Sequence, residues 1–261
     1  MKKLLLFAAL SAALTLLFAC TKEVKLQTET WKDHTEAPLG QGIDASFNYS
    51  ASVEYLSGGV SKPILEKINA IIVERVFFDE GSDVPAAGAV ARDRAVENYK
   101  NEVQDFLDLS ENPSENSWMY NWSSDVEGVF GSACKERSLQ TYVVSGSDYQ
   151  GGAHGMFGTA CYVIDMNTGA LVEEKDLFAD GYESTLAELL FKHRMDDMEE
   201  ATDLADPEDI FYAEIGPNNN FSVDEKGVTY YYSPYEIAPY VFGVITIPVP
   251  WEELKPILRQ P

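Results

Sequence analysis

The chain is poor in the side chains that metal sites and many active sites require. It has three histidines and three cysteines in 261 residues, and it contains no CxxC, no HExxH and no closely spaced histidine pair. Zinc sites need such clusters of ligands. A GxSxG elbow and an ordered nucleophile–base–acid series are lacking as well. We therefore expect no metal site, no cofactor and no catalytic residues, and hence a protein that is not an enzyme.

Basic residues are also few. Lysine and arginine number 19 against 43 aspartates and glutamates, which gives a formal net charge of −24. Binding to nucleic acid phosphates or anionic headgroups needs a basic face, so we expect no nucleic acid partner. A strong negative charge instead favours fast, salt-sensitive capture of a basic partner. Solubility alone is the alternative explanation of the same charge.

Long apolar runs are scarce too, and the longest lies at the start of the chain. Two lysines precede an apolar stretch from Leu4 to Ala19, which ends at Cys20. A short basic region followed by an apolar segment of this length is typical of a secretory signal peptide. A transmembrane helix needs about 20 apolar residues. We therefore predict a signal peptide over residues 1–19.

The end of this segment, Leu17-Phe18-Ala19-Cys20, resembles a bacterial lipobox. The resemblance implies cleavage before Cys20 and lipidation of that residue, and so a lipoprotein of the bacterial cell envelope that is held in the membrane by its lipid alone. Cleavage would remove two lysines and no acids, which leaves a net charge of −26. Whether the anchor faces the periplasm or the cell exterior stays open, and an ordinary secreted protein is the alternative.

The chain after Cys20 predicts an α+β fold with a largely antiparallel sheet and packed helices. Residues 20–43 are polar without a clear period and predict a flexible tether after the lipidated cysteine. Two sequential subdomains forming one compact unit are then expected, at residues 44–145 and 146–258. Alternation and helical spacing predict the elements: strands near 47–55, 118–130, 139–145, 157–165, 171–172, 221–223, 228–232 and 241–247, and helices starting at Ser61, Ala89, Thr185 and Pro250.

The segment "YQGGAHG", residues 149–155, joins two predicted strands and contains one of the three histidines. We expect Gly151, Gly152 and Gly155 to provide positive φ angles or close packing, and His154 to bond to the backbone. Contact with a ligand or partner is the alternative. Tyr149 and Tyr235 complete the set of candidate contact residues, because tyrosine is enriched at interfaces. Alternation in the last strands predicts that some of the other tyrosines are core.

The second half of the chain resembles the RsiV-like domain family. The resemblance lies in "YQGGAHG", "YVIDMNTGALVEEKDLF" and "FSVDEKGVTYYYSPYEIAPYVFGVITIPVPWEEL", and it covers roughly residues 142–254. That family includes the extracellular part of a lysozyme-sensing anti-sigma factor, an accessory region of the deacetylase PdaC and many bacterial lipoproteins. The first half, residues 44–145, is similar to the companion domain of the family only in its strand–helix–strand pattern.

The resemblance implies a fold and a recognition surface, with no catalytic role for any residue. The chain shows neither a sigma-binding segment nor the catalytic domain of the deacetylase, so those activities are not implied. We expect a non-enzymatic envelope binding protein whose partner is a basic protein such as lysozyme, or peptidoglycan. The alternatives are a glycan-acting enzyme that uses the GGAHG loop, and a structural accessory module.

Two cysteines, Cys134 and Cys161, remain after lipidation. Disulfides form in an oxidising envelope, so these two are a candidate pair. Their pairing stays open at this point, because it needs Cα atoms within about 7 Å.

Overall fold

The computed structural model describes residues 24–36, 45–109, 117–196, 211 and 214–259. Its larger layer is a six-stranded sheet in which the strands follow one another in sequence order. All neighbouring strands are antiparallel except β2 and β3, which are parallel. The strands are β1 (Lys25–Glu36), β2 (Ser46–Gly58), β3 (Trp122–Cys134), β4 (Leu139–Tyr149), β5 (Met156–Asp165) and β6 (Ala170–Val172).

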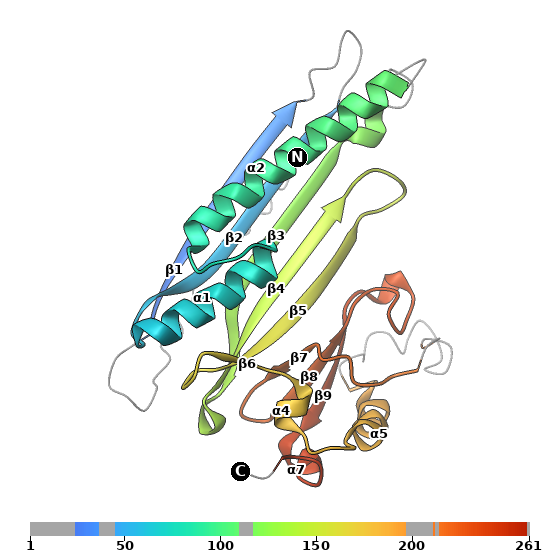
Figure 1. Cartoon of the computed structure of the whole chain (residues 1–261). Helices are drawn as coiled ribbons and strands as arrows, with labels where there is room; N and C mark the ends of the chain where they lie inside the picture. Colours follow the sequence, from blue (N-terminus) through green and yellow to red (C-terminus); the bar gives the residue numbers. More distant parts are fainter. Residues whose placement is uncertain (1–23, 37–44, 110–116, 197–210, 212–213, 260–261) are drawn as a thin grey trace, which may run out of the picture.

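Two helices connect the parallel pair and cover one face of this sheet (Figure 1). They are α1 (Lys62–Phe77) and α2 (Val84–Leu109). Parallel neighbours need such a crossover connection. Ile68, Ile72 and Val73 of α1 are fully buried, in one cluster with Ala51 and Val53 of β2. The alternation of apolar and polar residues along β2 therefore turns every second side chain toward the helices.

The C-terminal layer is smaller. It contains a three-stranded antiparallel sheet in the order β7-β8-β9, and Figure 1 places it below the long strands of the first sheet. Short helices surround it. The elements are α4 (Glu174–Leu177), α5 (Glu183–His193), β7 (Phe221–Val223), β8 (Gly227–Tyr232), β9 (Ile245–Pro250) and α7 (Trp251–Leu254).

This small sheet packs on the face of the large sheet that the helices leave free. Cys134, Leu139 and Val163 of the large sheet belong to one buried cluster with the residues of β7, β8 and β9. Polar contacts of two side chains, Thr141 and Asn220, also join the layers here. The Val223 N–H donates to Thr141 Oγ1 at 3.0 Å, and the amide of Asn220 joins the Cys161 N–H and the Thr159 carbonyl at 2.8 and 2.9 Å. We call the five large-sheet positions of this contact, Cys134, Leu139, Thr141, Cys161 and Val163, the covered half.

The α+β class is confirmed, with a mostly antiparallel sheet. The expected tether is wrong over residues 25–36, which form β1 and pair with β2 along its length. Its inward Trp31 is buried, and a Cβ on Gly88 of α2 would come within 2.4 Å of the indole ring. The remaining tether residues, 20–23 and 37–43, and Cys20 with the signal peptide lie outside the described residues.

The expected subdomain boundary at residues 145/146 is also wrong, because it falls inside β4, a central strand of the large sheet. Helix α2 begins at Val84, five residues before the expected start. Helix α5 begins at Glu183, and the expected capping box at Thr185 lies inside it; α4 instead has a capping box, between Glu173 and Asp176. The last strand begins at Ile245, because residues 240–242 form a 3-10 turn. Among the described residues, no helix is long and apolar enough to cross a membrane.

Candidate binding surface

Outward-facing polar side chains line up across four strands of the large sheet. Directly paired residues on neighbouring strands share a face. The register places Ser50 beside Asp125, Ser147 and Phe157 in one row, and Ser52 beside Glu127, Ser145 and Thr159 in the next. We call these eight positions the open half, because they line an open depression and only Phe157 among their side chains is described in ring contact with the C-terminal layer.

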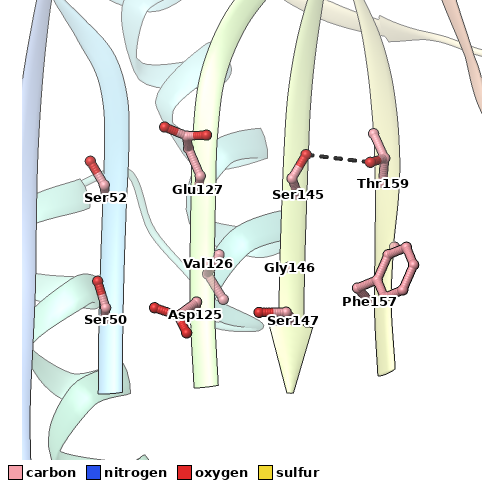
Figure 2. Close-up of a pocket in the computed structure, with 11 residues that line it drawn as sticks. Ser50, Ser52, Asp125, Val126, Glu127, Ser145, Gly146, Ser147, Phe157 and Thr159 are labelled. Atoms are coloured by element: carbon pink, nitrogen blue, oxygen red, sulfur yellow. Dashed lines mark hydrogen bonds between the residues drawn. The ribbon is translucent and has the colours of Figure 1, made fainter. Parts of the chain in front are cut away.

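The open half forms a shallow depression of about 430 Å³. Figure 2 shows its side chains standing on β2, β3, β4 and β5, with Ser145 and Thr159 joined by a hydrogen bond of 3.4 Å. Most of these side chains are short hydroxyl groups, so the backbone lies close to the surface. Such a floor offers many hydrogen-bonding groups to a ligand or partner.

The charged side chains that line the depression are all acidic. Asp125 and Glu127 are both exposed, and no lysine or arginine is among the described residues that line the depression. Lys32 of β1 lies one strand farther out, paired with Ser50. Two carboxylates at alternate positions of one strand therefore set a negative potential over the floor, which favours cationic groups.

The GGAHG loop closes the hairpin between β4 and β5 beside this depression. Gly151 and Gly152 have φ angles of +84° and +91°, so the expectation that these glycines provide positive φ is confirmed. A Cβ on Gly151 would also lie 2.5 Å from the carbonyl oxygen of Met119. The Tyr149 hydroxyl donates to the Gly152 carbonyl at 3.0 Å. The loop is thus held in one shape by its own residues.

His154 is exposed, and both nitrogens of its ring have neighbours. Nδ1 lies 2.9 Å from the carbonyl oxygen of Gly155, so it is the protonated nitrogen in the neutral ring. Nε2 then accepts from the Tyr235 hydroxyl at 3.4 Å. The expected bond to the backbone is therefore present. The nearest acid in sequence, Asp148, has a pKa that burial raises and a hydrogen bond with Gln150 partly lowers.

Three further aromatic rings gather around His154. Its ring centroid lies 4.3 Å from that of Tyr240 and 6.4 Å from that of Tyr235, and Phe157 meets Tyr240 edge-on at 5.3 Å. The Tyr240 hydroxyl donates to the Gly155 carbonyl at 2.8 Å, which joins the loop to the C-terminal layer. We call these four residues the aromatic corner. Because Phe157 also lines the depression, the corner and the open half are continuous.

Tyr235 has an unusual backbone. Its φ angle is +70° although it is not glycine, and its side chain remains 49% exposed. A bulky residue in the left-handed region costs roughly 1–3 kcal/mol, and such strained residues cluster at functional sites. The surrounding turn fixes it: the Tyr235 N–H donates to the Ala238 carbonyl, and the Glu236 N–H donates to the Ser233 carbonyl.

The structure brings the five predicted contact residues together. Tyr149, Gly151, Gly152, His154 and Tyr235 all lie in or beside the GGAHG hairpin, whereas the tyrosines of β8 divide as alternation predicted, with Tyr230 and Tyr232 buried. The carboxylates and serines of the open half are not among the predicted residues. Their only signal is the alternation of hydroxyl and acidic residues with apolar ones along the predicted strands.

The candidate disulfide is not formed, since Cys134 and Cys161 are both free and buried. Cys134 pairs with Leu139 of β4, and Cys161 pairs with Val143, four residues farther along that strand. Four residues of a strand span about 13 Å, well beyond the limit for a disulfide. Burial raises the pKa of the Cys161 thiol to about 12. Within the described ranges, no cluster of three His, Cys, Asp or Glu side chains is arranged to hold a metal ion.

Comparison with known proteins finds one family model that matches part of the chain and solved structures with a similar fold. Residues 175–252 match the family model described as "Protein of unknown function (DUF3298)". A solved DUF3298 structure from Bacteroides fragilis is similar with a TM-score of 0.81 at 20% identity, over 92% of this chain and 95% of its own. Another from Pseudomonas aeruginosa has a TM-score of 0.56 at 19% identity, over 90% and 95%. No curated protein matches the chain. At these identities the likeness shows the fold alone.

Proposed function

We propose that this chain is a lipid-anchored, non-enzymatic protein of the bacterial cell envelope that binds a basic protein on the open half of its large sheet. The observation that supports this most is the depression itself, whose described lining contains two exposed carboxylates and no basic residue. The net charge of −24 acts in the same direction at longer range.

A lysozyme is the sharpest candidate partner. The support is the resemblance of residues 142–254 to the RsiV-like family, together with the DUF3298 match inside that segment. Lipidation at Cys20 follows from the resemblance of residues 17–20 to a lipobox. Peptidoglycan is the second candidate ligand, because hydroxyl-rich floors beside aromatic rings also suit sugars.

A glycan-acting enzyme that uses the GGAHG loop has less support. A general base needs an orienting partner, usually a carboxylate. The ring nitrogens of His154 instead contact a backbone carbonyl and a tyrosine hydroxyl. An accessory role for another lipoprotein would be revealed by co-purification.

The experiment that tests the proposal is a binding titration of the full chain with lysozyme at low and moderate salt. An anionic protein of similar size is the control. We expect binding to lysozyme that weakens as salt rises, because screening acts on the contacts between exposed charges, and no binding to the control. Equal binding of both proteins, or of neither, would sink the proposal. Titration with peptidoglycan fragments separates the second candidate.

A further inference from the structure

We propose that the aromatic corner (His154, Phe157, Tyr235 and Tyr240) is a subsite for an arginine side chain of the partner. The guanidinium group would lie on the exposed ring faces, while Asp125 and Glu127 attract neighbouring basic groups. The inference rests on the proposed function and deepens it, because it assigns a particular chemistry to one end of the binding surface.

The rings form one partly exposed platform, in which His154 and Tyr235 are exposed and Tyr240 is half-buried. The planes of His154, Tyr235 and Tyr240 lie within 36° of one another, with centroids between 4.3 and 6.4 Å apart. Two exposed apolar residues adjoin corner residues in sequence, namely Met156 at 48% beside Phe157 and Val241 at 77% beside Tyr240. Planar rings with polar tips are suited to stacking with a planar cation.

The platform is also prepared before a partner arrives. The turn at residues 233–236 holds Tyr235 at a positive φ, and the Ser233 N–H donates to the Glu236 carboxylate at 2.8 Å. On the other side, Tyr240 bonds to the Gly155 carbonyl of the GGAHG hairpin. Two segments that lie far apart in sequence thus hold the rings in place, so little ordering is needed on binding.

The surroundings of this platform are poor in cations. Arginine is the cation in all three cation–π contacts found among the described residues, and these contacts lie elsewhere: Arg75 over Tyr162, Arg137 over Trp251 and Arg194 over Phe191. The two segments that build the corner, residues 138–174 and 227–254, contain no lysine or arginine at all. The corner therefore presents aromatic faces in acidic surroundings.

Arginine fits this corner better than lysine does. A guanidinium is planar and weakly hydrated, so it stacks on rings, whereas an ammonium is a compact and strongly hydrated charge. The local excess of carboxylates favours a cation over a neutral sugar. A sugar ring is nevertheless the other ligand that such rings could accept, and the test includes it.

The test compares hexa-arginine and hexa-lysine peptides binding to the full chain at one salt concentration. Both peptides have the same charge, so the ratio of their dissociation constants measures the preference for guanidinium over ammonium groups, and the Tyr235 variants separate stacking from hydrogen bonds to carboxylates. We expect hexa-arginine to bind about three- to tenfold more tightly. Tyr235→Asn should bring this ratio close to one, and asparagine tolerates the left-handed backbone, so the turn is retained. Tyr235→Phe should keep the ratio.

Tyr55→Leu is the matched control, because Tyr55 lies on β2 outside the corner and bonds to Gln27 of β1. His154→Ala is a second corner variant and should also lower the ratio. Equal binding of the two peptides by the unmodified chain, or a ratio that Tyr235→Asn leaves unchanged, would overturn the inference. Chitotetraose binding that Tyr235→Asn abolishes, with equal peptide affinities, would overturn it in favour of a sugar platform.

The peptide experiment does not use lysozyme, so the inference and the proposed function can fail separately. An arginine preference without lysozyme binding removes only the lysozyme assignment. Salt-sensitive lysozyme binding without an arginine preference removes only the subsite.

Discussion

The two halves of the outward face of the large sheet share strands β3, β4 and β5, but one half is buried and the other is open to solvent. In the covered half, Leu139 and Val163 are buried against the C-terminal layer. In the open half, Ser147 lies eight residues along the same strand as Leu139, on the same face, and is exposed. One end of β4 thus packs in a hydrophobic core, and the other end lies on a surface that is open to solvent.

The difference shows that side-chain chemistry, rather than strand geometry, sets where the C-terminal layer ends. The outward positions of β4 run from Leu139 through Thr141 and Val143 to Ser145 and Ser147. Apolar burial stabilises by about 25 cal/mol per Å², and hydroxyl groups gain nothing comparable. The small sheet therefore covers the apolar end, and the hydroxyl end remains available to a partner.

The largest loss of stability should come from a substitution in the core of the covered half. Leu139→Ala removes buried methyl groups and leaves a cavity, so we expect the free energy of unfolding to fall by about 2–4 kcal/mol. Ser147→Ala, on the same strand and face, should stay within about 0.5 kcal/mol of the parent. Urea unfolding of both variants measures this, and equal losses would mean that the two halves do not differ as described.

A smaller loss should follow from removing the polar link between the layers. Asn220→Ala leaves the Cys161 N–H and the Thr159 carbonyl without the amide that joins them, so we expect a loss of about 1–3 kcal/mol. Asn48→Ala is the control, because Asn48 is exposed on β2 and bonds to the exposed His34. A stability of Asn220→Ala equal to that of the control would show that the link does not hold the layers together.

Alkaline pH should lower the free energy of unfolding by a modest amount, through the buried Cys161 thiol of the covered half. The pKa of the buried Cys161 thiol is about 12, above its ordinary value of 9.0, because burial disfavours the thiolate. As pH rises, the unfolded chain therefore loses the thiol proton at a lower pH than the folded chain does. The stabilising effect of burying the neutral thiol is present below pH 9 and is lost as pH rises toward 12. Cys161→Ala should flatten that part of the stability curve. An unchanged slope in thermal unfolding against pH would contradict the burial assigned to Cys161.

The smallest expected effect is at the aromatic corner. Tyr235→Gly removes a strained left-handed tyrosine, so the gain from relieved strain should nearly offset the lost ring contacts and the flexibility of glycine. We expect a change in unfolding free energy below about 1 kcal/mol. Tyr240→Gly, at a residue without positive φ, should cost more. A larger loss for Tyr235→Gly than for Tyr240→Gly would show that the strain is absent.

Much of the core could be predicted from the sequence, because its periodicity is strong. The alternation from Phe47 to Val53 and the helical spacing of Ile68 and Ile72 both match the buried residues. The alternation fails at Tyr55, because Leu56 is buried in its place. The N-terminal strand could not be predicted in the same way. Strand β1 is an edge strand whose residues are nearly all polar, and its single buried anchor, Trp31, gives no period.

The candidate surface was predictable only where it is local in sequence. The GGAHG hairpin lies in one short segment, and its glycines and histidine stand out there. The open half combines residues from β2, β3, β4 and β5, and it exists only once the register is known. The boundary at residues 145/146 was wrong for the same reason, since strand pairing joins segments across it.

The most direct test of the central claim compares two pairs of charge removals in one lysozyme titration at low salt. Asp125→Asn with Glu127→Gln neutralises the open half, while Glu102→Gln with Asp105→Asn removes the same charge from α2, which packs on the opposite face. We predict that the first pair weakens binding by about tenfold or more, and that the second changes it less than about twofold. Equal effects of the two pairs would contradict the claim that the open half is the binding surface.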